Sequence, residues 1–178
     1  MKKPELLVTP HSVEHLEQLI EAGADAFVIG EQKFGLRLPG EFTIADVEKS
    51  VEIAHAAGKK VYVSVNALFH NDRLDALYAY MQEMERIQPD ALLFGDPAVV
   101  MAVRELNITV PLHWSPETIA TNWFQVNYWA ERGAKRAVLA RELSMEEVTE
   151  IKENANAEIE VQVHGMTCMF QSKRSLLG

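Results

Sequence analysis

The chain has 178 residues, of which 48% are hydrophobic, so it can bury the core of one globular domain. Its 17 Lys and Arg against 26 Asp and Glu give a formal net charge of -9, which argues against a surface that attracts phosphate over its whole extent. No apolar run approaches the roughly 20 residues of a membrane span, and residues 1–10 lack the apolar core of a secretory signal, so we expect a cytoplasmic protein.

Short apolar runs alternate with amphipathic helical patterns along the chain. Seven of these runs are predicted strands: Glu5–Val8, Ala26–Ile29, Lys60–Val65, Ala91–Phe94, Val110–His113, Arg136–Ala140 and Ile159–Val163. A helical pattern separates each strand from the next. The alternation predicts a parallel sheet that is buried on both faces.

Several of the helical patterns begin with recognisable N-terminal signals. Ser12 and Thr43 each stand as an N-cap before an apolar pattern of helical spacing. Pro97 lies at the first position of a predicted helix. Ser144 followed three residues later by Glu147 predicts a capping box.

Two architectures fit this alternation, an open doubly wound sheet and a (β/α)8 barrel. The first strand-to-helix joint, residues 8–16, lacks the glycine fingerprint of dinucleotide-binding sheets. Seven strands are one short of eight, and a full barrel has about 250 residues. We therefore predict a single domain over residues 1–178, an incomplete TIM-like barrel whose closing strand begins in residues 172–178 or lies beyond Gly178.

Active sites of parallel βα folds lie at the C-terminal ends of the strands, which directs attention to the polar residues there. The connection after the second strand carries Glu31, Lys33 and Arg37. Arg37 could clamp a carboxylate or phosphate through two hydrogen bonds, or could be a solvated loop charge. Asn66, after the third strand, could orient a substrate group or cap a turn.

The next strand ends offer fewer candidates. Asp96 precedes a helix and is expected to be its N-cap. His113 is either a catalytic base or a buried histidine with a satisfied hydrogen bond. Arg141 and Glu142 are expected to form an ion pair at the rim.

His164 and Cys168, the only cysteine, follow the seventh predicted strand. A nearby imidazolium would lower the pKa of the thiol, so the two residues could form a nucleophile and its base. Cys168 could instead be a metal ligand or an inert, buried thiol. The sequence contains no C-x-x-C or H-E-x-x-H zinc pattern and no G-x-S-x-G elbow.

Two segments, "GADAFVIGEQKFGLR" (23–37) and "RELSMEEVTEIKENANAEIEVQVHG" (141–165), together with Cys168, resemble the peptidase U32 family. The likeness is strongest to a shorter bacterial subgroup that includes tRNA hydroxylation proteins. The resemblance implies C5 hydroxylation of wobble uridine in tRNA, with prephenate as the hydroxyl source and a related family member as a partner subunit.

Related family members hold a 4Fe-4S cluster on four cysteines, the first two in the pattern H-G-x-x-C-x-x-x-x-G-x-C. Cys168 matches the first cysteine, but Lys173 and Ser175 stand where the family has the glycine and the second cysteine. Serine oxygen is a harder and less acidic ligand than thiolate. The resemblance therefore implies that any cluster is completed elsewhere in the whole protein or belongs to a partner.

The resulting hypothesis is a tRNA-hydroxylating protein whose anionic small ligand lies at the rim. Lys33, Arg37 and Glu31 would contact this ligand. The other expected lining residues are Asn66, His113, His164 and Cys168. The absence of basic runs interleaved with aromatic residues suggests that a partner or a C-terminal region supplies most contacts to tRNA phosphates.

Three alternatives stay open at this stage. A peptidase would use Cys168 as nucleophile and His164 as base. A non-catalytic subunit would offer its open sheet edge to another chain. An aldolase or isomerase would need a lysine or carboxylate at a strand end, whereas Lys33 lies in the loop beyond one.

Overall fold

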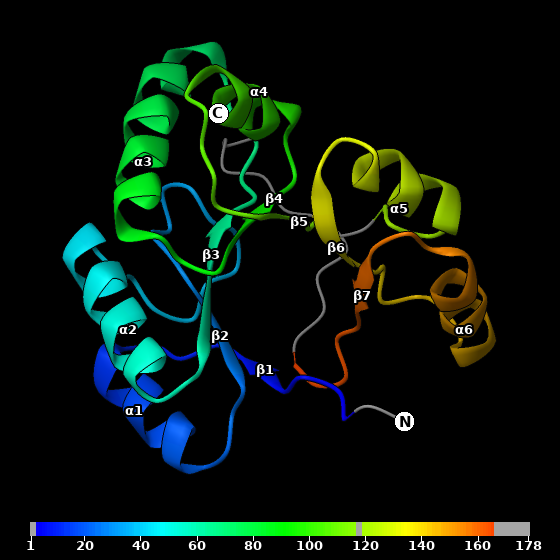
Figure 1. The fold of residues 1–178 in the computed structure, drawn as a ribbon, viewed down its shortest axis with the longest axis horizontal. Coiled ribbons are helices and arrows are strands. Elements are labelled where there is room, and N and C mark those ends of the chain that lie inside the picture. The colour runs from blue at the N-terminus through cyan, green and yellow to red at the C-terminus, as the bar shows by residue number, and fades with distance from the viewer. Residues whose placement is uncertain (1–2, 117–118, 166–178) are drawn as a thin grey trace, which may run out of the picture.

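A computed structural model describes residues 3–116 and 119–165. Parallel strands follow one another in chain order in one seven-stranded sheet. These strands are β1 (Leu7–Val8), β2 (Ala26–Ile29), β3 (Lys60–Val65), β4 (Ala91–Phe94), β5 (Leu112–Trp114), β6 (Ala134–Val138) and β7 (Glu158–Glu160). Figure 1 shows the helices arranged around the outside of this curved sheet.

One α-helix connects each strand to the next. The helices are α1 (Val13–Glu21), α2 (Ile44–Ala56), α3 (Leu74–Ile87), α4 (Pro97–Glu105), α5 (Trp123–Ala130) and α6 (Met145–Asn154), with a short 3-10 turn at Asn71–Arg73 before α3. The strand order never reverses, and a reversal is what defines a doubly wound sheet. Within the described residues β7 does not pair with β1, so the fold is the incomplete TIM-like barrel that the sequence predicts.

The middle of the sheet forms where the sequence places it, and its edges do not. The bounds of β2, β3 and β4 agree with the prediction, whereas β1 and β7 are shorter. Strand β5 begins after Pro111, which has no N–H to donate to a ladder, and its register shifts between Leu112 and His113. Strand β6 begins two residues earlier than predicted. The proposed start of a closing strand in residues 172–178 lies outside the described residues.

The predicted helix caps are confirmed. Ser12 accepts a backbone N–H from the first turn of α1. Ser144 and Glu147 form the reciprocal capping box of α6, and Thr43 forms a second such box at α2. Asp96 is the N-cap of α4, accepting one backbone N–H of that helix and another from the loop after β3. The cap of α4 therefore also ties two neighbouring strand-to-helix loops together.

The two faces of the sheet bury different kinds of side chain. The face toward the helices is apolar and carries most of the core. The inner face has a smaller apolar group, contributed by Ala26, Val28, Tyr62, Ala91 and Leu93. Five buried polar residues belong to the strands or their ends, namely Ser64, Asn66, His113, Ser115 and Arg136. Buried polar groups need partners, so the inner face is the place to look for a site.

The core predicts a strong contrast between two leucines. Leu92 is fully buried on β4, and Leu68 is 69% exposed in the loop after β3. Leu92→Ala should lower the free energy of unfolding by about 2–5 kcal/mol, because it removes buried methyl groups and leaves a cavity. Leu68→Ala is the matched control and should change it by less than about 0.5 kcal/mol. Urea unfolding measures both, and equal losses would contradict the assignment of β4 to the core.

Candidate functional site

The loop between β2 and α2 folds back over the C-terminal end of β3. The backbone N–H of Leu36 donates to Oδ1 of Asn66 at 2.8 Å, and the N–H of Ala67 donates to the carbonyl of Phe34 at 2.9 Å. Arg73, in the 3-10 turn before α3, also donates to the carbonyl of Lys33 at 2.8 Å. These bonds hold the loop as a fixed part of the rim.

Two glycines allow this close approach. A Cβ on Gly35 would lie 3.0 Å from the backbone oxygen of Ser64. A Cβ on Gly95 would lie 3.2 Å from the backbone oxygen of Asn66 and 3.3 Å from that of Ser115. All three distances are shorter than ordinary carbon–oxygen contacts, so a side chain at either position would push the rim segments apart.

The three charged residues predicted to contact a ligand lie on this loop. Glu31 and Arg37 are partly buried, and Lys33 is exposed with its ammonium 5.2 Å from the ring centre of Phe34. Burial, together with the charge of Glu41, raises the pKa of the Glu31 carboxyl. Arg37 has a left-handed backbone with φ of 54°, an uncommon conformation for a residue with a side chain. The loop thus places two cations and a carboxyl at the strand ends.

Asn66 has a structural function that the sequence left open between two alternatives. Its side chain is buried, and Oδ1 accepts hydrogen bonds from the Leu36 N–H and from the Ser64 hydroxyl, each at 2.8 Å. The amide oxygen therefore holds the loop to the end of β3. A direct contact between Asn66 and a ligand stays a prediction.

His113 does not join Asn66 at the rim, which corrects its predicted position. It lies in the middle of β5, and its ring packs edge-on against Tyr62 with centroids 4.8 Å apart. It lines a cavity at the opposite, N-terminal ends of the strands. Its Nδ1 atom is buried without a hydrogen-bond partner. Burial and the neighbouring charge of Arg136 lower the pKa of His113 to about 4, so the ring is neutral at pH 7.

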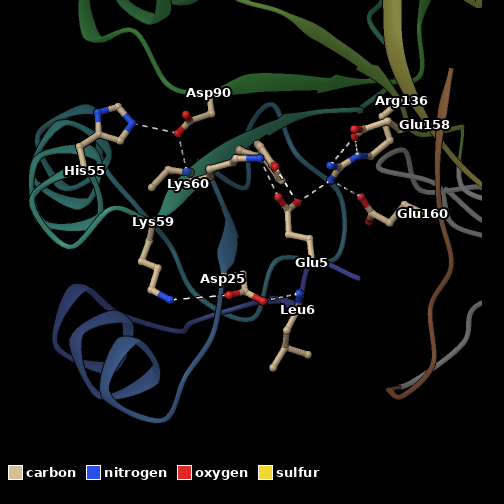
Figure 2. A network of polar contacts seen from close by, with 12 residues as sticks. Glu5, Leu6, Asp25, His55, Lys59, Lys60, Asp90, Arg136, Glu158 and Glu160 are labelled. Atoms are coloured by element: carbon tan, nitrogen blue, oxygen red, sulfur yellow. Dashed lines mark hydrogen bonds and ion pairs between the residues drawn. The ribbon is translucent and has the colours of Figure 1, made fainter. Parts of the chain in front are cut away.

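A network of charged residues occupies the N-terminal half of the barrel interior, as Figure 2 shows. Arg136 on β6 donates from Nη1 to Glu5 at 2.9 Å, and from Nε and Nη2 to one oxygen of Glu158 at 3.0 and 2.7 Å. A carboxylate oxygen of Glu160 lies 3.6 Å from Nη1. The cation therefore faces three carboxylates from the two ends of the sheet.

Glu5 is the second centre of this network. Burial alone would raise the pKa of its carboxyl, but hydrogen bonds from Lys60, Tyr62 and Arg136 lower that pKa to about 2. Lys60 donates at 2.8 Å and the Tyr62 hydroxyl at 2.7 Å. The sequence had placed Glu5 and Arg136 only as strand residues, because no local pattern reports a contact between positions so far apart in the chain.

The last strand leads to the remaining predicted site residues. His164 is exposed shortly after β7, and its carbonyl accepts a hydrogen bond from Gln162 at 3.3 Å. Gln162 also accepts a hydrogen bond from Arg141 Nε, which connects this segment to the joint after β6. Cys168 lies outside the described residues, so its pairing with His164 stays a prediction.

Comparison with known proteins identifies the family to which this chain belongs. The sequence profile of Peptidase family U32 matches residues 11–178, and the chain belongs to this family. It resembles the solved structure of the U32 peptidase Mk0906 with a TM-score of 0.74 and 19% identity, over 94% of this chain and 73% of that one. At that identity the likeness shows the shared fold.

Within the family, the chain is similar to proteins named for tRNA hydroxylation. It is 61% identical to tRNA hydroxylation protein P2 of Bacillus subtilis (strain 168) over 178 residues, which are 100% of this chain and 58% of that protein. It is 37% identical to tRNA hydroxylation protein P1 of the same organism, over 99% of this chain and 42% of that protein. The chain thus spans little more than half the length of the first relative.

Residues 3–116 and 119–165 contain no group of three or more His, Cys, Asp or Glu side chains placed to hold a metal ion. No helix in the same residues combines the length and the apolar character that a bilayer crossing requires.

The contact made by Asn66 leads to a testable expectation for the rim loop. Asn66→Ala removes the acceptor of the Leu36 N–H, so this amide should exchange with solvent at least about tenfold faster, and the free energy of unfolding should fall by about 1–3 kcal/mol. Asn66→Asp keeps an oxygen at the same place and should retain protection. Hydrogen exchange measured by NMR tests both, and an unchanged Leu36 amide in the alanine variant would refute the role of Asn66.

The lowered pKa of Glu5 predicts how stability depends on pH. Because the folded pKa lies below the unfolded one, ionised Glu5 stabilises the fold above about pH 4.5, and this contribution is lost as the pH falls toward 2. Glu5→Gln should therefore lower the free energy of unfolding at pH 7 by about 1.5–3 kcal/mol. The difference between the two proteins should shrink on acidification. A gap that stays constant in urea unfolding between pH 6 and pH 2.5 would contradict it.

Proposed function

We propose that this chain is the barrel region of a protein that hydroxylates C5 of the wobble uridine of tRNA. The observation that carries the proposal is the 61% identity to tRNA hydroxylation protein P2, which extends over the whole chain. The chain spans 58% of that relative, so the activity is proposed for the whole protein. A cytoplasmic location, where tRNA is modified, is part of the same proposal.

The rim loop supports a small anionic ligand as the substrate held by the barrel. Lys33 and Arg37 are cations on a loop that hydrogen bonds fix to β3, and Arg37 is partly buried, where a charge interacts more strongly than in open solvent. Two guanidinium N–H groups suit the two oxygens of a carboxylate. Prephenate, a dicarboxylate, is the hydroxyl source that we propose for this site.

Glu31 lies on the same loop as these cations, near Lys33, and has a different role in the proposal. Its raised pKa makes it more easily protonated than an exposed glutamate, so it can donate a hydrogen bond to a ligand oxygen or take up a proton there. In the complete site it would orient the anion that Arg37 and Lys33 attract. His164 and Cys168 would lie on the far side of the ligand.

A 4Fe-4S cluster does not fit this chain alone. The family pattern requires four cysteines, and the sequence contains only Cys168, with Ser175 at the second position. We therefore propose that any cluster belongs to the remainder of the whole protein or to a related subunit, for which a P1-type protein is the natural candidate. A non-catalytic supporting function within such a pair is the second form of this proposal.

Peptidase activity receives less support from the described residues. Among them, no serine hydroxyl is hydrogen-bonded to the imidazole ring of a histidine, and His113 lines the N-terminal cavity away from the rim loop. The remaining candidate pair is His164 with Cys168. An active Cys168→Ser protein in the hydroxylation assay would remove that pair as an explanation of function.

The test is the content of 5-hydroxyuridine at the wobble position in cells that lack this protein and its P1-type relative. Restoring both full-length proteins should restore the modified base, whereas Arg37→Ala in this protein should lower it at least about tenfold, because the guanidinium that holds the anion is lost. Arg104→Ala, which removes an exposed arginine from α4, is the matched control and should leave the content unchanged.

Mass spectrometry of digested tRNA measures the modification directly. Unaltered 5-hydroxyuridine after deletion of both genes would overturn the proposed function. Normal modification with Arg37→Ala would overturn only the assignment of the anion site to the loop after β2.

A further inference from the structure

A cavity of about 400 Å³ opens at the N-terminal ends of the strands, the opposite side from the rim loop. Its lining residues come from the starts of β3 to β7 and the segments before them: Lys60, Tyr62, Asp90, Pro111, His113, Lys135, Arg136 and Glu158. This volume is within the range of small-molecule sites. The proposed hydroxylation site does not use this cavity.

One wall of the cavity contains a polar atom whose hydrogen-bonding capacity is not used. His113 is 5% exposed, and its Nδ1 atom has no hydrogen-bond partner. Nε2 of the same ring has no hydrogen-bond partner within the described residues either and is not among the buried atoms, so it is the ring nitrogen that a ligand in the cavity can reach. The ring is neutral, so its N–H can donate to an anion without a second charge having to be buried.

The cations at the cavity have spare donors. Lys60 donates to Glu5 at 2.8 Å, which leaves two of its three ammonium N–H groups, and its side chain is 52% exposed. Lys135 is exposed, and within the described residues it forms no hydrogen bond or ion pair. The guanidinium of Arg136, by contrast, is taken up by the carboxylates of the network.

The carboxylates near the cavity already have partners. Glu158 accepts two hydrogen bonds from Arg136, and Asp90 accepts the Val61 N–H at 2.8 Å and lies 2.9 Å from His55 Nε2. Deeper in the barrel, Glu5 and Glu160 face Arg136, and burial raises the pKa of Glu160. These contacts engage one oxygen of Asp90 and one of Glu158, whereas Lys60 keeps two N–H groups and Lys135 has no partner within the described residues, so the opening has charged donors that no carboxylate occupies.

We propose that this cavity binds a small organic anion that carries a carboxylate or phosphate group. The anionic group lies between the ammonium groups of Lys60 and Lys135 and accepts a hydrogen bond from His113. The apolar part of the ligand packs against the Tyr62 ring and Pro111. The site is separate from the rim loop, so it does not depend on the proposed hydroxylation function.

Calorimetric titration of the full-length protein with benzoate and with phenyl phosphate tests the proposal, because the two probes share an apolar ring and differ in the anionic group. We expect saturable binding of at least one probe, and which one binds identifies the preferred group. Lys135→Met should weaken that binding by about threefold to tenfold, as for the loss of one charge-assisted hydrogen bond. Lys152→Met, an exposed lysine on α6, is the matched control and should leave it unchanged.

Further variants locate the site. Arg37→Ala should keep the affinity of the wild type, because the rim loop lies at the other ends of the strands, and Lys60→Met should weaken binding as Lys135→Met does. Absence of saturable binding of both probes overturns the proposal. Equal effects of Lys135→Met and Lys152→Met, or loss of binding only in Arg37→Ala, overturn it as well.

Discussion

The buried guanidinium of Arg136 is the interaction on which this open barrel depends. Its side chain is 9% exposed, and removing such a charge from water costs several kcal/mol unless anions and hydrogen bonds compensate. Compensation comes from Glu5, which precedes β1, and from Glu158 and Glu160 on β7. The first and last strands share no ladder in the described residues, so this cation connects through charge the two ends of a sheet that hydrogen bonding leaves open.

The two ends of the barrel are held together by different kinds of interaction. At the N-terminal ends, burial and the charge of Arg136 keep His113 neutral, and hydrogen bonds from Lys60, Tyr62 and Arg136 keep Glu5 ionised. At the C-terminal ends, backbone contacts dominate, because the glycines let the loop after β2 approach β3 and Asn66 ties it down. This division follows the general behaviour of TIM barrels, in which the N-terminal side serves stability and loops on the C-terminal side carry function. The charged interior therefore provides a rigid base for a loop that can diverge in sequence.

The sequence predicts this fold well where the signals are local. Strands β2 and β4 are continuous apolar runs buried on both faces, and β3 is buried along all but its first residue. The caps at Ser12 and Ser144 depend on neighbours three residues away. The prediction is weaker where contacts between residues far apart in the chain determine the bounds or the register of a strand. His113 was placed at a strand end, but β5 starts after Pro111 and its register shifts, which moves the histidine into the strand.

The candidate site also has one part that local sequence patterns predicted and one part that they did not. Periodicity identified the loop that carries Lys33 and Arg37, since it follows a well-defined strand. The contact of Glu5 with Arg136 spans 131 positions and has no local signature. The one available signal was an arginine within a predicted buried strand, together with acids at alternate positions of β7, because a charge in such a place requires a partner.

The charge of the chain also bears on how the barrel and the RNA are related. A net charge of -9 disfavours a broad phosphate-binding surface, and Arg136 and Lys60 in the barrel are paired with carboxylates. A few cations on a fixed loop suit a small anion better than the backbone of a tRNA. In the proposed function, the barrel would therefore hold the small reactant, and a partner or the part of the relatives' length that this chain does not span would supply the contacts to tRNA.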